Sequence, residues 1–259
     1  MMYILAIFMG FLLGMLGGGG SILTVPILVY VGNIPAQNAT GYSLFIVGVT
    51  ALIGSIINMR KSLVRTREGL VFAVPALLTM YAMRAGILPM IPETVILPFV
   101  TVEKATLIMI VFSIVMMIAG LRMLRQQIQQ HTPSNLNYIH IIISGAIVGI
   151  VTGFVGAGGG FLIVPALVLL LRLPIREATA TSLFVITLNS MVGFSGDIIS
   201  GANFDWNIMG IFTAVSILGM IIGIKIATII NPQKIKTIFA WFIMVMSVFI
   251  LTKELFFHS

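Results

Sequence analysis

The sequence contains no cysteine and few charged residues. Without cysteine the chain has no disulfide, no thiolate metal ligand and no thiol chemistry. Only 21 of 259 residues are charged, 14 basic and 7 acidic, which is 8%, whereas a soluble domain carries about 25%. So few charges cannot cover a water-facing surface, and an ordinary soluble enzyme is excluded. With 59% hydrophobic residues, the chain is predicted to be an integral membrane protein.

The formal net charge of +7 does not indicate a nucleic-acid partner. Nucleic-acid binding needs a dense basic patch, and the basic residues here are scattered along the whole chain. An excess of Lys and Arg is instead typical of the cytoplasmic side of membrane proteins. The first eleven residues lack a basic region and a small-residue cleavage site, so they are not read as a cleaved signal peptide. We expect a multi-pass protein of the cell membrane with the lipid bilayer as its partner.

The sequence repeats itself at a constant offset of 139 residues. Gly14–Pro26 matches Gly153–Pro165, and Ala39–Phe45 matches Ala178–Phe184. From Gly14 to Phe45, fifteen of 32 aligned positions are identical. The chain is therefore an internal duplication, with a first membrane repeat over 1–124, a polar linker over 125–137 and a second membrane repeat over 138–259.

Each repeat contains four apolar segments. Three in each repeat have roughly the twenty residues that cross about 30 Å of hydrocarbon. The segments are 3–31, 39–59, 69–87 and 105–123 in the first repeat, and 138–171, 178–200, 206–230 and 236–256 in the second.

The first segment of each repeat has an unusual length and a glycine interruption. Either 3–31 and 138–171 are single long tilted helices, or each is a re-entrant helix–glycine–helix hairpin. If both cross the membrane, the basic residues divide seven to seven between the two sides; if both re-enter, eleven lie on one side against three. The second distribution obeys the positive-inside rule. We therefore expect an all-α polytopic protein of two inverted repeats, each a hairpin plus three transmembrane helices, with both termini outside.

The two glycine clusters are the first candidate site. Inverted repeats place broken helices at the midplane, where the N-termini of half-helices point at anionic groups. Free N–H groups and the helix dipole there favour an anion. The alternative is that the glycines only allow close helix packing. The candidate residues are Gly18, Gly19, Gly20 and Ser21 in the first repeat, and Gly158, Gly159, Gly160 and Phe161 in the second.

Polar residues follow one face of the next segment in each repeat. Thr40, Ser43 and Thr50 correspond to Thr179, Ser182 and Asn189. Spacings of three and ten residues keep each trio within about 80° on a helix. Of these, Thr40, Ser43, Thr179, Ser182 and Asn189 are candidates to complete an oxyanion shell. Alternatively, the two threonines are N-caps and the other residues form interhelical hydrogen bonds.

Arg84 is the remaining candidate, because a membrane arginine needs a partner, a wet cavity or a route to the interface. It either attracts an anion or anchors a helix end. The glycine clusters match no P-loop or dinucleotide motif, so nucleotide binding is rejected. No H-E-x-x-H and no pair of membrane carboxylates is present, and the histidines have no metal spacing. We expect no cofactor and no metal.

With these glycine–proline and Ala-Thr-x-x-Ser-Leu-Phe elements in both halves, the chain resembles the TauE/SafE family of sulfite exporters. The segment from Val74-Pro75 through Arg84 to Pro89 and Pro92 also resembles a variant of the family's first half. The chain departs from the family at Arg67-Glu68-Gly69, where many first halves have an Asp-Trp like Asp205-Trp206 here. The resemblance implies a secondary carrier of sulfite, thiosulfate or an organosulfonate, and not an enzyme. A membrane-embedded enzyme and a structural subunit are the alternatives. A small anion is the expected substrate, and a second copy of the chain is a further candidate partner.

Overall fold

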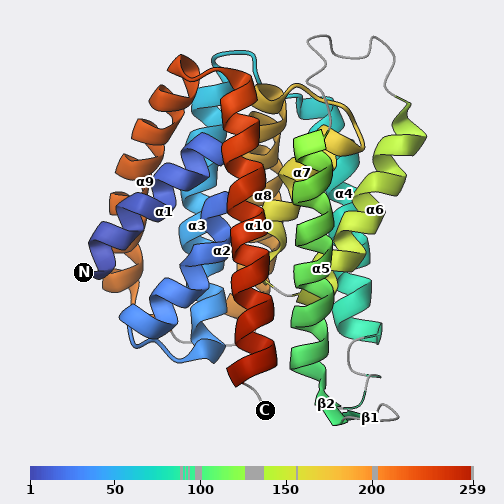
Figure 1. The fold of residues 1–259 in the computed structure, drawn as a ribbon. Coiled ribbons are helices and arrows are strands. Elements are labelled where there is room, and N and C mark those ends of the chain that lie inside the picture. The colour runs from blue at the N-terminus through green and yellow to red at the C-terminus, as the bar shows by residue number, and fades with distance from the viewer. Residues whose placement is uncertain are drawn as a thin grey trace.

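The computed structural model describes residues 1–87, 90, 92, 94–96, 101–125, 137–155, 157–199 and 204–257. Most of the predicted linker, 126–136, lies outside the described residues. The chain forms a bundle of helices with one short two-stranded ribbon (Figure 1). The elements are α1 (Met2–Leu16), α2 (Gly19–Pro26), η1 (Ile27–Val31), α3 (Ala36–Met59), α4 (Thr66–Ala82), η2 (Met83–Ile87), β1 (Thr94–Ile96), β2 (Thr101–Glu103), α5 (Lys104–Arg125), α6 (Tyr138–Val155), η4 (Ala157–Leu162), α7 (Ile163–Leu169), α8 (Ile175–Ile199), α9 (Trp206–Ile229) and α10 (Pro232–Phe257).

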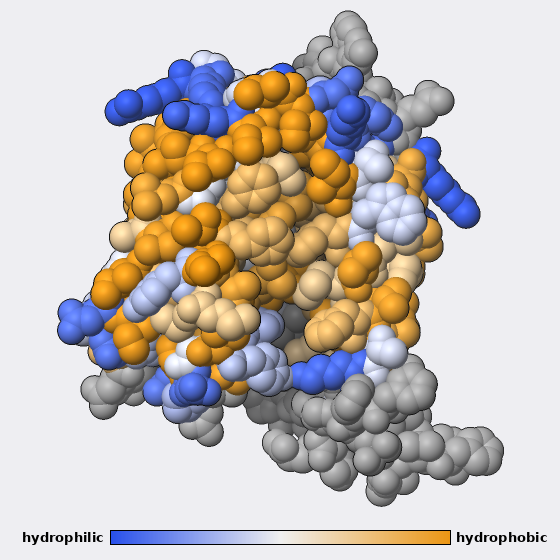
Figure 2. Space-filling view, turned by 60° about the vertical axis from the view of Figure 1, so that its left-hand side comes forward, coloured by the Kyte–Doolittle hydropathy of each residue, from blue (hydrophilic) through white to orange (hydrophobic). Residues whose placement is uncertain are grey.

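Five helices in the described part of the chain are long and apolar enough to cross a membrane: α3, α5, α8, α9 and α10. The sixth expected span, 69–87, is formed by α4 and continued by the π-helical turn η2. Figure 2 shows an apolar band across the molecule, with hydrophilic residues gathered above and below it. The prediction of a helical, multi-pass membrane protein is therefore confirmed. The ribbon, in which Thr94 pairs with Glu103, was not expected.

The segment over 3–31 is not a single helix. It forms α1, a break at Gly17 and Gly18, and a second helical stretch of α2 and η1. The two arms pack against each other, since a methyl group added to Gly20 would lie 2.4 Å from the main-chain oxygen of Met9. At the open end, one added to Gly32 would lie 3.0 Å from Sδ of Met2. The segment is therefore a hairpin whose two ends lie together.

Proline explains the change of helix type inside this hairpin. Pro26 has no N–H to donate and interrupts the regular ladder. After it the helix widens into the π-form over Ile27–Val31, and Gly32 N–H bonds to the oxygen of Ile27 at 3.0 Å. The corresponding Pro165 lies inside α7, which remains α-helical.

The segment over 138–171 also breaks at its glycines. α6 ends at Val155, η4 is a 3₁₀ turn over Ala157–Leu162 that packs on α6, and α7 follows with its main contacts on α8. In Figure 1, α1 rises toward its break whereas α6 descends toward its own.

Each long hairpin arm packs on a helix of the other repeat. A methyl group on Gly10 would lie 1.9 Å from the main-chain oxygen of Ser216, which places α1 against α9. Gly149, which corresponds to Gly10, contacts α4 in the same way, with Ala76 O at 2.2 Å from an added methyl. Small residues allow such close approach of helix backbones in a membrane. The two repeats are therefore interlocked by symmetric exchange of their first arms.

The corresponding helices of the two repeats also pack directly on each other. Gly48 of α3 contacts Ser190 of α8, and Gly54 of α3 contacts Leu183 of α8. Residue numbers therefore increase along α3 while those of the contacting residues decrease along α8. The α5–α10 pair is likewise antiparallel, because Ser247 bonds to the oxygen of Ser113 while Gly120 packs on Ile243. Corresponding helices therefore run in opposite directions.

Polar contacts tie helix ends together at one end of the bundle. Nε of Arg65, before α4, lies 2.7 Å from Oε2 of Glu177 on α8. This bond is the main cause that raises the pKa of Arg65 above its usual value, against the effect of burial. Arg176 donates to the main-chain oxygens of Thr228 (3.1 Å) and Ile230 (3.0 Å) at the end of α9. Arg65 and Arg176 therefore lie at the same end, whereas the arrangement in which all eight segments cross would separate them.

The glycine interface gives the first prediction. Gly149→Ala places a methyl group 2.0 Å from Oγ1 of Thr79 and 2.2 Å from a main-chain oxygen, so α4 and α6 must move apart. We expect a loss of about 1–3 kcal/mol of stability, measured by thermal unfolding of the purified protein. Gly210→Ala is the control, because no described atom outside its own stretch of helix lies within 4 Å of its added methyl. Equal stability of the two variants would contradict the described packing.

Candidate functional site

The tips of the two hairpins meet inside the protein. A methyl group on Gly18 would lie 2.8 Å from Cα of Phe161 and 2.9 Å from the main-chain oxygen of Gly160. One on Gly160 would lie 3.3 Å from Oγ of Ser21. Ser21 and Phe161 are buried. The structure therefore brings together glycine-cluster residues from both repeats, with main chain against main chain.

Gly17 makes the turn at the first tip. Its φ of 78° is in the left-handed region that glycine adopts without steric cost. Its N–H bonds to the oxygen of Leu13 at 2.8 Å, which closes α1. An added methyl group would also lie 2.5 Å from Oγ of Ser182 and 2.7 Å from Cα of Thr179. The first tip therefore rests on the start of α8, beside the hydroxyl of Ser182 and the main chain of Thr179.

The hydroxyl hydrogens at this junction are used within their own helices. Ser21 donates to the oxygen of Gly18 at 2.7 Å, Ser182 to Thr179 at 2.7 Å and Thr179 to Arg176 at 3.0 Å. Each hydroxyl can rotate toward another acceptor. The N-cap alternative is wrong for both threonines, because Thr40 and Thr179 are each the fifth residue of their helix.

The remaining candidates lie on or near the two hairpins. Thr40 is exposed and Ser43 is buried on α3, and Gly41 between them packs on Phe204 and Oδ2 of Asp197. The backbone of Gly158 and Gly159 lies in η4, and that of Gly19 and Gly20 begins α2. Gly156, which corresponds to Gly17, lies outside the described residues, so the contact of Ser43 with the second tip stays a prediction.

Two residues that correspond to each other have a buried side-chain oxygen without a hydrogen-bond partner in the described part of the chain. They are Thr50, through Oγ1, and Asn189, through Oδ1. Thr50 is fully buried, and Ser55 Oγ on the same helix is also without a partner. A buried polar group without a partner is costly and calls for an explanation such as a water or a ligand. Thr50 is therefore added to the candidates, as Asn189 already was.

Arg84 lies in η2, and its side chain is outside what the structure describes, so its role stays a prediction. The described His, Asp and Glu residues form no group of three that could hold a metal ion.

A family model described as "Sulfite exporter TauE/SafE" matches residues 2–250 of the chain. The chain belongs to the TauE/SafE family. Two proteins from strains of Xylella fastidiosa, each named "Probable membrane transporter protein", are 29% and 30% identical to it over 95% of this chain and 92% of their own length. A third, "Probable membrane transporter protein MJ0441" of Methanocaldococcus jannaschii, is 24% identical over 95% of this chain and 94% of its own. No solved structure matches.

This TauE/SafE chain is thus a multi-pass membrane transporter. The repeat of the sequence could predict both glycine clusters, but not that the first tip would rest on α8 of the second repeat. A sequence signal for that contact does exist: Gly10 and Gly14 on α1 recur as a small-residue pair at the spacing of Gly219 and Gly223 on α9. Helix pairing in a membrane follows such small-residue faces.

The cysteine-free sequence of this TauE/SafE protein allows a direct test of the tip contact. Ser21→Cys combined with Gly160→Cys places two thiols where Cβ of residue 160 lies 3.3 Å from the side chain of residue 21, within reach of a disulfide. We expect oxidation to protect both thiols from maleimide labelling. Ser21→Cys with Gly210→Cys is the control, since the surroundings of Gly210 are open. Equal labelling of both pairs after oxidation would refute the contact.

Proposed function

We propose that the protein is a secondary transporter of a small sulfur-containing oxyanion, such as sulfite, thiosulfate or an organosulfonate, across the cell membrane. The meeting of the two glycine tips carries the proposal. Each tip brings main-chain N–H groups into the buried centre of the bundle, and the first turn of α2 leaves the N–H groups of Gly19 and Gly20 without helical acceptors. An oxyanion is the ligand that such groups bind best.

The proposed shell is neutral. Hydroxyls of Ser21 and Ser182 lie at the first tip, and Thr179 lies one turn before Ser182. No Lys or Arg lies between Met1 and Met59 or between Leu173 and Asn203 except Arg176 near the start of α8. A neutral shell suits a carrier, because a full opposite charge in a dry site holds an anion tightly. Thr50 contributes a buried hydroxyl that has no partner among the described residues and can donate to an anion. The side-chain oxygen of Asn189 only accepts, so Asn189 would serve the shell through its amide N–H groups.

An inverted arrangement of the two repeats in the membrane is part of the proposal. Two observations support it: corresponding helices run antiparallel, and Arg65 pairs with Glu177 beside Arg176. Proteins of this architecture bind substrate where the broken helices meet. The end that carries Arg65 and Arg176 is then the cytoplasmic side.

Cysteine labelling tests this orientation. With an impermeant thiol reagent on intact cells, we expect Asn207→Cys to react and Lys61→Cys to react only after the membrane is opened. Both positions are exposed at helix ends. If both repeats crossed in the same sense, the two loops would lie on one side and the two cysteines would react alike. The native chain has no cysteine and is its own blank.

Flux into proteoliposomes tests the binding site. Gly18→Ala forces a methyl group against the main chain of the second tip at 2.8 Å, whereas Gly19→Ala meets only movable side-chain atoms at 3.2 Å or more. We expect saturable uptake of labelled sulfite by the native protein, loss of most of it in Gly18→Ala, and near-native uptake in Gly19→Ala. The amount of inserted protein is measured alongside.

A second pair of variants separates binding from folding. Thr50→Val removes a buried hydroxyl that has no partner, so the fold loses nothing while a bound anion loses a donor. The expected rise in KM is up to about tenfold, from a typical net hydrogen-bond contribution of about 0.5–1.5 kcal/mol. Thr213→Val is the control, because that hydroxyl bonds to Met209 of its own helix at 2.7 Å. No saturable flux of any sulfur oxyanion would favour a structural subunit or an enzyme instead.

A further inference from the structure

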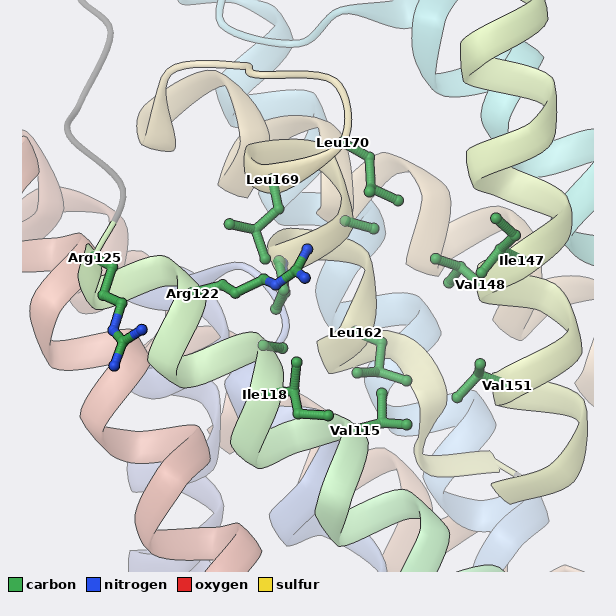
Figure 3. Close-up of a pocket in the computed structure, with 13 residues that line it drawn as sticks. Val115, Ile118, Arg122, Arg125, Ile147, Val148, Val151, Leu162, Leu169 and Leu170 are labelled. Atoms are coloured by element: carbon green, nitrogen blue, oxygen red, sulfur yellow. The ribbon is translucent and has the colours of Figure 1, made fainter.

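A cavity of about 560 Å³ lies between α5, α6 and α7 (Figure 3). Eleven of the thirteen residues that line it are apolar and the other two are Arg122 and Arg125. The volume corresponds to roughly twenty water molecules at about 30 Å³ each, yet an apolar wall offers water almost no hydrogen bonds. The cavity is thus shaped for a hydrocarbon group rather than for water or for a small free anion.

The cavity is continuous with the membrane-facing surface. Ile118 of α5 and Ile147 of α6 both line it, and each is 50% exposed. Their exposed neighbours along these helices, among them Ile114 and Ile143, are apolar as well. A group that fills the cavity therefore enters sideways from the hydrocarbon of the bilayer.

The two arginines stand at one end of this apolar space. They are three residues apart in the last turn of α5. Figure 3 shows the guanidinium of Arg122 extended over the cavity toward Leu169, whereas the side chain of Arg125 extends in another direction, away from that of Arg122. The ion pair that the described residues form elsewhere, Arg65 with Glu177, does not involve them. The sequence has no Asp or Glu between Glu103 and Glu177, so no acidic residue in the adjoining sequence is available to neutralise the pair.

An apolar slot with two arginines at its interfacial end matches one ligand chemistry. We propose that the cavity binds an anionic phospholipid, with an acyl chain between α5, α6 and α7 and the phosphate on Arg122, which Arg125 joins through a change of rotamer. Arginine binds phosphate through paired N–H donors, and basic pockets between transmembrane helices on the cytoplasmic side are suited to anionic lipid head groups. The positive-inside arrangement places Arg122 and Arg125 on that side.

The acyl chain would also support the second hairpin. Leu162 of η4 and Pro165 of α7 form one wall of the cavity, and Phe161, next to Leu162, is the residue that Gly18 touches at the meeting of the tips. Filling the cavity therefore holds η4 against the first tip. This consequence extends the proposed function, but the lipid site itself stands without it.

Native mass spectrometry and thermal unfolding of the purified full-length protein test the site. The probes are phosphatidylglycerol and phosphatidylcholine with identical acyl chains, and glycerol phosphate without chains. We expect phosphatidylglycerol to bind and to raise the melting temperature more than phosphatidylcholine, and glycerol phosphate to have no effect. The double variant Arg122→Gln/Arg125→Gln should weaken phosphatidylglycerol binding by about thirtyfold and leave phosphatidylcholine unchanged.

Two further variants make the result specific. Arg60→Gln/Lys61→Gln removes another exposed basic pair, after α3, and should leave the lipid preference intact. Ala119→Phe fills the apolar slot and should weaken both lipids, measured as the increment over the lipid-free protein. Equal loss in the two double variants would mean unspecific surface attraction and would overturn the site. Binding of glycerol phosphate as strong as that of the lipid would identify a free-phosphate site instead.

Discussion

Non-helical backbone inside a membrane protein has to be enclosed, because lipid cannot accept its hydrogen bonds. This chain breaks its helices at Gly17–Gly18 and again at Ala157–Leu162. Both breaks lie against other main chain: Gly18 faces Gly160 and Phe161, and Gly17 faces α8. The interlocking of the repeats fits this requirement, since each tip is covered in part by the opposite repeat.

The enclosure depends on residues with little or no side chain. Along α1, Gly10 and Gly14 let α9 approach, and along α6, Gly149 and Gly153 let α4 approach. These four positions correspond in pairs across the offset of 139 residues. The duplication that produced two tips thus also produced two matching helix-packing surfaces, and each lies on a helix of the opposite repeat.

Much of this architecture could be predicted from the sequence, because hydropathy and the repeat are one-dimensional signals. The expected segment 206–230 is α9, and 105–123 is α5 with one or two more residues at each end. The partners of each helix were not predicted, because lipid tails are as apolar as leucine and leave no hydrophobic force to select a neighbour. The π-helical stretch after Pro26 was missed for a related reason: proline signals a disturbance, while its form depends on packing.

The candidate site likewise combines features that the sequence predicts with features that only the structure shows. The sequence placed Ser182 and Thr179 beside a glycine cluster, and the structure brings them to Gly17 of the other repeat. It could not show that their hydroxyl hydrogens already bond to their own helix, or that Thr50 and Asn189 have oxygens with no partner among the described residues. Such facts depend on rotamers and on three-dimensional burial, which a spacing pattern does not contain.

On the proposed function, the tip contact also determines how the transporter can move. An anion that binds between Gly18 and Gly160 needs room that their present main-chain contact does not leave, so the tips must part to admit it. The first tip belongs to α1, which is held by α9, and the second to α6, which is held by α4. Parting the tips therefore displaces each hairpin together with a helix of the opposite repeat. The glycine interfaces leave little freedom for one arm to move alone, so motion at the site is transmitted to both ends of the bundle.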